Sequence, residues 1–204
     1  MTYSIDNEQL EKLKNMEGSI RGVALKTDEH FIVKNGDEET MKRVQNKAKE
    51  MGADISYEEI DKMAFYPFSW RVISLLAVSQ EFSLDEEGIK KIGEMAPRAS
   101  FLIKFFAKHF MSVERTLSKV SQIWSKHYTV GTMEALRVDE QQKEAVFRLH
   151  DFNAHPILCA YLIGYLSSVV SMVIGEKAVG KEVKCSLQGD DFHEFYITWK
   201  QQDE

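Results

Sequence analysis

Residues 183–199, VKCSLQGDDFHEFYITW, contain two runs in which apolar and polar residues alternate, on either side of a Gly-Asp turn signal. Successive side chains of a strand point to opposite faces, so each run predicts a strand with one apolar face. The first face comprises Val183, Cys185 and Leu187, and the second comprises His193, Phe195, Ile197 and Trp199. We therefore expect an antiparallel hairpin, over 181–187 and 192–199, that packs on a folded body.

The register of this hairpin follows from the requirement that both apolar faces point inward. Cys185 then lies opposite His193, and Val183 lies opposite Phe195. This register needs a loop with an odd number of residues, which 188–190 supplies with a glycine at its centre. The Cβ atoms of Cys185 and His193 are expected to lie about 4.5–5.5 Å apart.

The rest of the chain divides into further strands and helices. Strands are expected over 19–26, 30–33, 128–138 and 145–152, and helices over 37–51, 57–62, 67–80, 85–95, 97–110, 112–126 and 155–175. Because the strands come mostly in adjacent pairs, an antiparallel sheet packed against a layer of helices is favoured over a doubly wound fold. The sequence thus predicts an α+β protein: a polar N-terminal helix or frayed segment over 1–18, and a single α+β domain over 19–200.

The last expected helix contains no charged residue over 157–175, ILCAYLIGYLSSVVSMVIG. That length is close to what spans a bilayer. The segment contains three serines, however, and the hairpin that follows it alternates as a strand pair of a folded protein does. We therefore interpret it as a buried core helix and expect no membrane span.

Charge and motif content argue against several functional classes. The net charge is −6 and the pI is near 5.6, without the basic patch that nucleic acids or anionic membranes attract. The common phosphate-binding, dinucleotide-binding and hydrolase motifs are missing, so we expect no enzymatic activity. The two cysteines and the polar N-terminus, which has no apolar h-region, favour free thiols in a cytoplasmic protein.

Bulky apolar residues are plentiful, with 12 Phe and 9 Met. Such residues suit a core that encloses a cavity, because Met adapts its shape; a Phe-rich core without a cavity is the alternative. The candidate lining residues of an apolar pocket are Trp70, Phe101, Phe105, Phe106, Tyr161 and Tyr165.

Four residues form a candidate metal site. His155 and Cys159 are four residues apart and project from one face of a helix, while Cys185 and His193 meet across the hairpin. If the helix packs on that face of the sheet, the four side chains give a Cys/His set suited to Zn²⁺. Burial of the thiols as small apolar side chains, with His155 capping its helix, is the alternative.

His109 and His127 are candidate haem ligands through their imidazoles. His109 follows the Phe-rich stripe, and His127 ends a helix. A histidine at a helix end is more often a favourable partner of the helix dipole.

Two surfaces are candidates for a homodimer interface. Gly164, Ser168 and Ser171 share one helix face and allow close backbone approach, within the monomer or across a dimer. The second surface is the heptad-like face that runs from Val113 to Trp124.

The closing pattern Cys185-x-x-x-Gly189-Asp190-x-x-His193-Glu194-Phe195-x-Ile197-x-Trp199 resembles that of the 4-vinyl-reductase-type domains, which usually have a second Cys where this chain has His193. The wider pattern is similar to an uncharacterised myxobacterial family of similar length. The residues that carry this wider resemblance, which covers about 19–200, are Ile20, Gly22, Tyr66, Pro67, Cys159 and Gly164.

This resemblance implies membership of the superfamily that includes haem-nitric-oxide-binding domains and the Golgi-tethering TRAPP subunits. The implied fold is the ligand-binding fold of the nitric-oxide-signalling and Golgi-transport type, in which helices pack on an antiparallel sheet around a ligand cavity. The haem-binding branch has a Tyr-x-Ser-x-Arg motif that this chain lacks, so no haem is expected. His193 leaves the family's cysteine cluster altered but competent to bind a metal, so zinc remains an open alternative.

Together these observations favour a non-catalytic, small-molecule-binding or sensory domain. Its expected ligand is a hydrophobic small molecule or lipid in an apolar interior pocket. A scaffold module that acts as a homodimer is the alternative hypothesis, and a haem- or zinc-binding protein is a weaker one.

Overall fold

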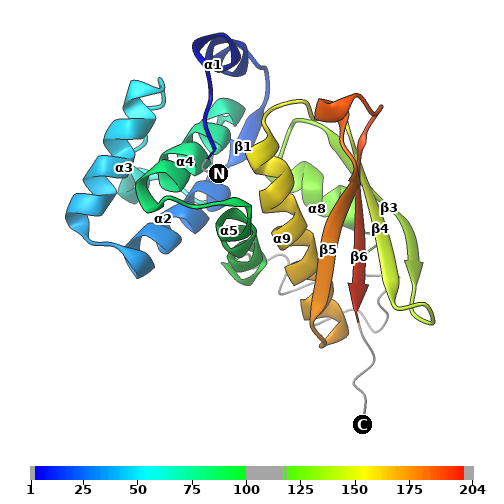
Figure 1. Cartoon of the computed structure of the whole chain (residues 1–204). Helices are drawn as coiled ribbons and strands as arrows, with labels where there is room; N and C mark the ends of the chain where they lie inside the picture. Colours follow the sequence, from blue (N-terminus) through cyan, green and yellow to red (C-terminus); the bar gives the residue numbers. More distant parts are fainter. Residues whose placement is uncertain (1–2, 100–116, 118, 200–204) are drawn as a thin grey trace.

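The computed structural model describes residues 3–99, 117 and 119–199 (Figure 1). The helices are α1 (Asn7–Lys14), α2 (Val23–Asn35), α3 (Glu38–Glu50), α4 (Phe68–Phe82), α5 (Glu86–Ala99), α8 (Val120–His127) and α9 (Pro156–Ile174), with 3₁₀ turns η1 (Tyr57–Glu59) and η2 (Ser186–Gln188). The strands are β1 (Ser19–Arg21), β2 (Phe65–Pro67), β3 (Thr132–Asp139), β4 (Glu144–His150), β5 (Ala178–Lys184) and β6 (His193–Trp199). The main sheet has the order β3-β4-β6-β5, and every pairing in it is antiparallel. The predicted α+β class is therefore confirmed.

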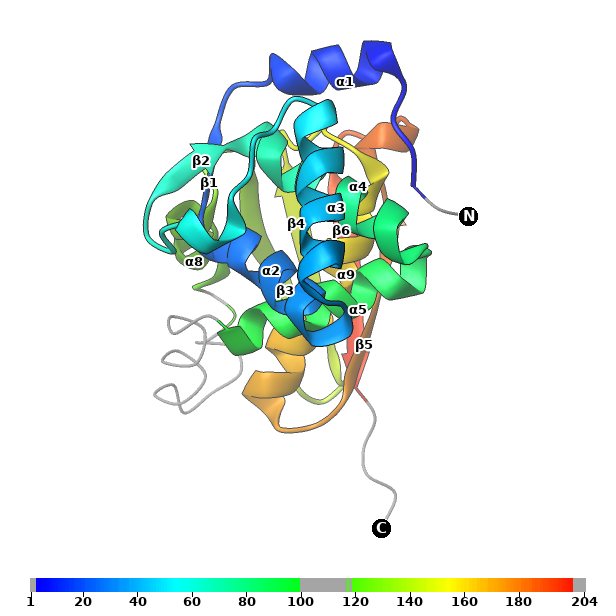
Figure 2. The same ribbon diagram turned by 90° about the vertical axis from the view of Figure 1, so that its left-hand side faces the viewer.

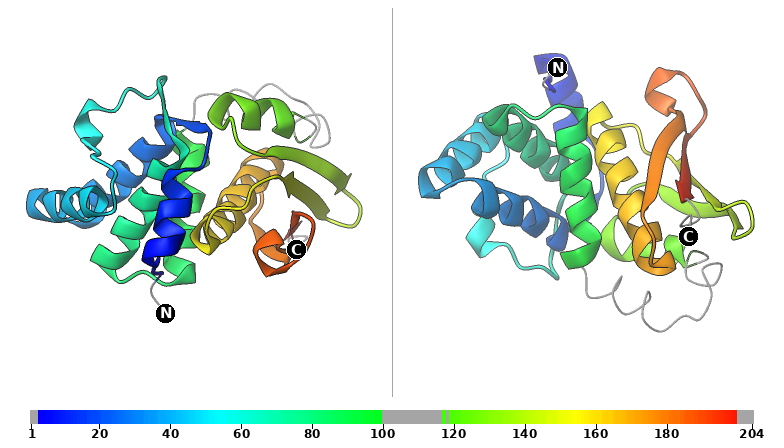
Figure 3. Two further views of the ribbon diagram at one scale, coloured as in Figure 1. Left: turned by 90° about the horizontal axis from the view of Figure 1, so that it is seen from above. Right: turned by 60° about the horizontal axis from the view of Figure 1, so that its bottom comes forward.

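The elements form layers around the long helix α9. The helices α2, α3, α4 and α5 lie on one side of α9 and the four-stranded sheet lies on the other (Figures 1 and 3). Helix α1 crosses one end of the helical layer (Figure 2). This arrangement explains why α9 is apolar all round, because it buries one face against α5 and another against the sheet.

Local signals set the ends of α9. The backbone N–H of Ile157 donates to Nδ1 of His155 at the N-cap, Pro156 occupies the first turn, and Gly175 ends the helix with a φ of 77°. Most of this helix lies buried in the protein, although by length and composition it could cross a membrane. The interpretation of 157–175 as a core helix agrees with this placement.

Small residues bring α9 close to α5. A Cβ atom at Gly164 would lie 1.9 Å from the carbonyl oxygen of Lys90, and one at Gly93 would lie 2.1 Å from that of Tyr161. The hydroxyl of Ser168 donates to the carbonyl oxygen of Glu94 at 2.8 Å. The small-residue face of α9 is thus used for packing within the chain.

A buried ion pair joins α2 and α4, and sequence analysis missed it. Arg71 and Asp28 are both fully buried, and Arg71 Nη1 donates to Asp28 Oδ2. Ser74 Oγ donates to the same carboxylate oxygen at 2.5 Å and pairs with the hydroxyl of Tyr57 at 2.7 Å. The Arg71 guanidinium also lies 4.2 Å from the ring centre of Tyr161 on α9. The pair therefore connects the helical layer to the central helix.

This ion pair explains a wrong prediction. Strands were expected over 19–26 and 30–33, with the polar residues 27–29 as the turn between them, but β1 ends at Arg21 and residues 23–35 form α2. Asp28 is not a turn residue, because it is buried against Arg71. Thr27 is also inside the helix, where its hydroxyl donates to the carbonyl oxygen of Val23 at 3.2 Å.

A second prediction was wrong at Pro97, which was expected to open a new helix. Pro97 lies inside α5, which continues to Ala99. The fixed φ of proline is compatible with helical backbone, so its cost is the loss of one intrahelical hydrogen bond and a local steric clash. The Phe-rich segment that follows lies outside the described residues.

The register of the closing hairpin also differs from the prediction. Phe195 lies opposite Glu182 rather than Val183, because a bulge interrupts β5 between Glu182 and Lys184. Val183 is 46% exposed, and Leu187 lies in η2 and is 37% exposed. A bulge inserts one unpaired residue and turns the following side chains to the other face. Cys185 and His193 nevertheless both point inward and are buried.

Candidate functional site

The N-terminal end of α9 and the closing hairpin bring four metal-ligating side chains together. Cys159, Glu182, Cys185 and His193 each offer one ligand atom, and these atoms all lie within 4.8 Å of one another. The Sγ of Cys159 lies 4.0 Å from that of Cys185 and 3.8 Å from Nδ1 of His193. Two thiols, one imidazole and one carboxylate form a donor set of the type that zinc prefers.

Hydrogen bonds fix the orientation of the His193 ring. Its Nε2 lies 2.9 Å from the carbonyl oxygen of Phe152 and 2.6 Å from Ser186 Oγ, and its Nδ1 lies 2.7 Å from Glu182 Oε1. Because the carbonyl needs the Nε2 proton, Nδ1 of a neutral ring presents a lone pair. A lone pair and a carboxylate oxygen this close need a proton or a cation between them. A backbone carbonyl that orients the other ring nitrogen is typical of metal-ligating histidines.

The two thiols lie in a site that disfavours free thiolates. Burial raises the pKa of Cys159 far above its ordinary value, and the nearby Glu182 raises it further. Burial also raises the pKa of Cys185. A groove of about 370 Å³ runs to both cysteines past Lys90 and Lys181. The cluster is therefore reachable from solvent, although its thiols are not reactive nucleophiles by themselves.

Three of these four residues, Cys159, Cys185 and His193, were predicted from the sequence as metal ligands. His155, which was predicted with them, lies outside the cluster: its Nδ1 accepts from Ile157 N–H at 3.2 Å, and its Nε2 lies 3.1 Å from the carbonyl oxygen of Ser4. Glu182 was missed, because the predicted register placed it on the outward face of β5. The bulge in β5 is what brings it inward, and no sequence signal identified that bulge.

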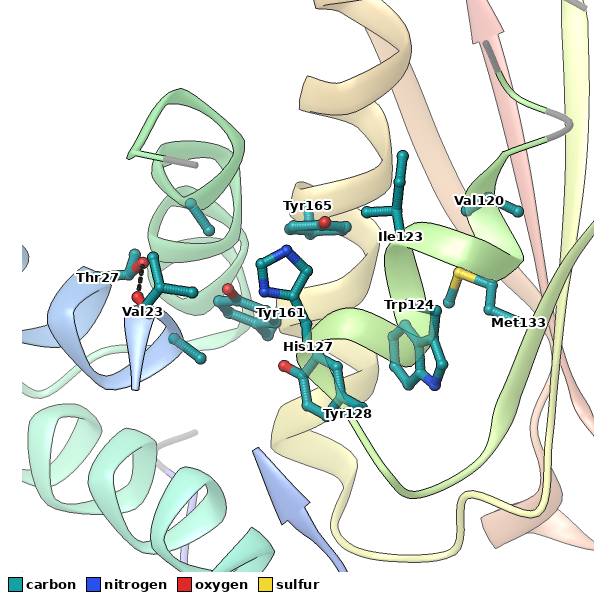
Figure 4. A pocket seen from close by; sticks show the side chains of 12 residues that line it. Val23, Thr27, Val120, Ile123, Trp124, His127, Tyr128, Met133, Tyr161 and Tyr165 are labelled. Atoms are coloured by element: carbon teal, nitrogen blue, oxygen red, sulfur yellow. Dashed lines mark hydrogen bonds between the residues drawn. The ribbon is translucent and has the colours of Figure 1, made fainter. Parts of the chain in front are cut away.

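A second candidate site is an apolar pocket between α2, α5, α8 and α9 (Figure 4). The cavity itself has a volume of about 40 Å³. It lies within a wider hollow of about 500 Å³, which opens to solvent. The described lining residues are Val23, Ala24, Thr27, Ala96, Val120, Ile123, Trp124, His127, Tyr128, Met133, Tyr161 and Tyr165. Tyr161 and Tyr165, which were selected from the sequence, are among these lining residues.

The other residues selected as pocket lining do not belong to this described set. Trp70 is partly buried and stacks on Tyr66, with ring centres 5.7 Å apart. Phe101, Phe105 and Phe106 lie outside the described residues. The walls that α2 supplies were missed because that segment was predicted to be a pair of strands.

His127 is the polar residue that distinguishes this pocket. It ends α8, is only 9% exposed, and its Nε2 has no hydrogen-bond partner among the described residues. Figure 4 shows its ring among the side chains that line the pocket. Burial lowers its pKa to about 4, assisted by the charges of Arg21 and Lys126, so the imidazole is neutral at pH 7.

The indole nitrogen of Trp124, in contrast to Nε2 of His127, has hydrogen-bond partners among the described residues. Trp124 lines the same pocket, and its Nε1 donates to the carbonyl oxygens of Val130 and Gly131 at 3.0 and 3.1 Å. Most buried polar atoms are satisfied in this way, and an unsatisfied one costs about 1–3 kcal/mol. The unsatisfied nitrogen of His127 therefore needs an explanation that Trp124 does not need.

A haem does not fit the described part of this pocket. The cavity of about 40 Å³ beside His127 has no room for a porphyrin. The other candidate haem ligand, His109, lies outside the described residues. We therefore assign no haem-dependent role to His127.

Comparison with known proteins places the fold. No family model and no curated protein sequence matches the chain. Among solved structures, an H-NOX protein from S. oneidensis in the Fe(II)NO ligation state is similar, with a TM-score of 0.65, 14% identity, and 89% of this chain and 100% of that chain covered. An H-NOX protein mutant from K. algicida is similar with a TM-score of 0.65 and 11% identity, and the match covers 90% of this chain and 98% of that chain. An oxygen-binding H-NOX domain related to soluble guanylate cyclases is similar with a TM-score of 0.59 and 14% identity, and the match covers 88% of this chain and 93% of that chain. At these identities the likeness establishes the fold alone.

Proposed function

We propose that this chain is a non-catalytic, ligand-binding domain of the sensory kind, and that its ligand occupies the apolar pocket at His127. The observation that carries the proposal is the buried Nε2 of His127, a polar atom with no described partner in a pocket with apolar walls. Ligand pockets typically combine apolar walls with a few well-placed polar groups. A ligand that pairs with this nitrogen would remove the cost of leaving it unsatisfied.

The place of the pocket in the fold supports a sensory role. Ala24 and Ala96 line it from the helical layer, and Tyr165 and Ile123 line it from α9 and α8. An occupant that contacts both sides favours the arrangement that fits it best, and so shifts the population of states. Two of the similar H-NOX structures, the Fe(II)NO form from S. oneidensis and the oxygen complex, hold a small ligand, which supports binding of a small ligand in this fold.

We expect xenon to bind in this pocket, because xenon enters apolar cavities without needing a hydrogen bond. Ala96→Phe fills the cavity and should abolish the binding. Val179→Phe, at a position that is 57% exposed, is the control and should leave it unchanged. Binding is measured by ¹²⁹Xe chemical shift against protein concentration. Xenon that fails to bind the wild type, or that binds Ala96→Phe equally well, would rule out the proposed pocket.

A second candidate function is zinc binding by Cys159, Glu182, Cys185 and His193. The convergence of their ligand atoms within 4.8 Å favours it, as does the resemblance to 4-vinyl-reductase-type domains. Four-coordinate zinc sites made of Cys, His and carboxylate ligands are tetrahedral. A zinc ion here would join α9 to the closing hairpin and stabilise their packing.

We expect one zinc ion per chain after reconstitution and dialysis. Cys185→Ser should lose it, because two thiolates account for most of the binding strength of such a set. His155→Asn is the matched control, since Asn also caps helices and His155 lies outside the cluster. Metal content is measured by elemental analysis. Wild-type protein that stays metal-free, or a Cys185→Ser variant that keeps its zinc, would reject this function.

Five further expectations from the sequence remain proposals. They are the relation to the myxobacterial and 4-vinyl-reductase-type families, the cytoplasmic location, the single domain over 19–200, the scaffold role and the homodimer. The homodimer has little support from the described residues, because the small-residue face of α9 packs on α5 and because Ile123 and Trp124 of α8 are buried.

A further inference from the structure

The unsatisfied nitrogen of His127 constrains the polar group of a ligand. A neutral imidazole has one N–H donor and one acceptor nitrogen, so Nε2 donates in one tautomer and accepts in the other. A hydroxyl group has a donor and an acceptor on the same oxygen and pairs with either tautomer. A ketone or an ether pairs with only one of them. A hydroxyl is therefore the best general partner for this site.

The charge that a ligand can carry in this pocket depends on the charges of the residues that line it. None of the described residues that line the pocket carries a formal charge when His127 is neutral. A carboxylate would lose its hydration here without gaining a charged donor, which is costly in apolar surroundings. An ammonium group would likewise lose its hydration without gaining a charged acceptor, because no lining residue in the described part of the chain is acidic. The walls favour a neutral ligand.

The shape of the ligand follows from the narrow cavity. About 40 Å³ is free, within a hollow of about 500 Å³ that opens to solvent. An aromatic ring needs an enclosed apolar cavity of about 150 Å³, so the cavity of about 40 Å³ admits only the hydroxyl end of a slender molecule, whose remaining carbons would lie in the hollow towards its mouth. A primary hydroxyl on an unbranched chain has a smaller cross-section, and Ile123 and Met133 offer apolar surface to such a chain.

We infer that the pocket takes a slender neutral alcohol whose hydroxyl group pairs with Nε2 of His127. This inference rests on the proposed function, since it names the chemical class of the ligand of the same pocket. It adds a specific role for His127, which recognises the hydroxyl, and it predicts discrimination by the head group at constant chain length.

The test compares three molecules with the same five-carbon chain: 1-pentanol, pentanoate and pentylamine. Dissociation constants are measured at pH 7 by NMR titration of the ¹⁵N-labelled protein. We expect 1-pentanol to bind about tenfold or more tightly than the two charged molecules, and to change the ¹⁵N shift of His127 Nε2. Equal affinity for all three would overturn the inference.

Two variants identify the residue responsible. His127→Leu should weaken 1-pentanol binding about three- to tenfold, which corresponds to one neutral hydrogen bond. It should not lower the melting temperature, because Nε2 has no described partner to lose. His150→Leu is the matched control, since His150 lies on β4, outside the pocket, and its Nε2 lies 3.2 Å from Glu134 Oε1. Its affinity for 1-pentanol should stay unchanged.

Failure of this inference can be distinguished from failure of the proposed function. If the wild type binds xenon but His127→Leu binds 1-pentanol as tightly as the wild type does, the pocket stands and the assigned ligand class is wrong. If 1-pentanol leaves the ¹⁵N shift of His127 unchanged and a crystal structure shows a water molecule alone on Nε2, the assigned contact is also wrong. If xenon does not bind, both proposals fail.

Discussion

Replacing Arg71 with Met is expected to destabilise the fold by about 3–5 kcal/mol, the usual cost of removing one partner from a buried ion pair. Both side chains of the pair with Asp28 are fully buried. Without the guanidinium, the hydrogen bond from Ser74 would be the one side-chain hydrogen bond left to the carboxylate among the described residues. Urea denaturation followed by tryptophan fluorescence measures the loss.

The pH dependence of this variant tests the mechanism. Burial already raises the pKa of Asp28 in the wild type, against the lowering effect of Arg71, so the pKa should rise further when Arg71 is removed. An acid with a raised pKa in the folded state stabilises the fold at low pH, and this contribution is lost as the pH rises through the folded pKa. The defect of Arg71→Met should therefore be larger at pH 8 than at pH 5.

Two further variants complete this experiment. Asp28→Leu combined with Arg71→Met should recover most of the lost stability, because no unpaired charge remains buried. Arg43→Met is the control: Arg43 pairs with Glu81 but is 53% exposed, so its loss should cost at most about 1 kcal/mol. A cost for Arg71→Met as small as that of the control, at both pH values, would show that the buried pair does not hold the helical layer together.

The Asp28–Arg71 pair also shows what the sequence could predict and what it could not. The bounds of α9 were predictable because His155, Pro156 and Gly175 are local end signals. Helix α2 was missed because the reason for burying Asp28 lies 43 residues away, in Arg71. No local pattern contains that information.

The residues of the two candidate sites also differ in how far the sequence could predict them. Alternation along the hairpin predicted that Cys185 and His193 point inward, and Cys159 was expected near them if its helix packs on that face of the sheet. Glu182 required knowledge of the β-bulge, which depends on how β5 pairs with β6. The unsatisfied state of His127 required the full set of its neighbours, since a sequence does not show which polar atoms lack partners.

Replacing Gly164 with Val is expected to destabilise the fold by roughly 3 kcal/mol, at the upper end of the usual cost of overpacking. A Cβ atom there would lie 1.9 Å from the carbonyl oxygen of Lys90, which is backbone and cannot rotate away. Helices α5 and α9 must therefore separate. Urea denaturation again measures the loss.

The smaller change Gly164→Ala decides between two effects of opposite sign. Helix propensity alone predicts a gain of about 1 kcal/mol, because Ala is the better helix former. The close approach to Lys90 predicts a net loss, because the added Cβ forces the two helices apart. Gly88→Ala on α5 is the control: the nearest atom to its Cβ would be the Cβ of Leu84 at 2.9 Å, in the segment just before α5, so a small shift of that segment relieves the contact and part of the propensity gain is expected to remain. A gain at both positions would show that the α5–α9 contact is loose. A loss at Gly164 alone would show that this contact is tight. The same contact would then hold the pocket walls together, because α5 carries Ala96 and α9 carries Tyr165, which both line the pocket.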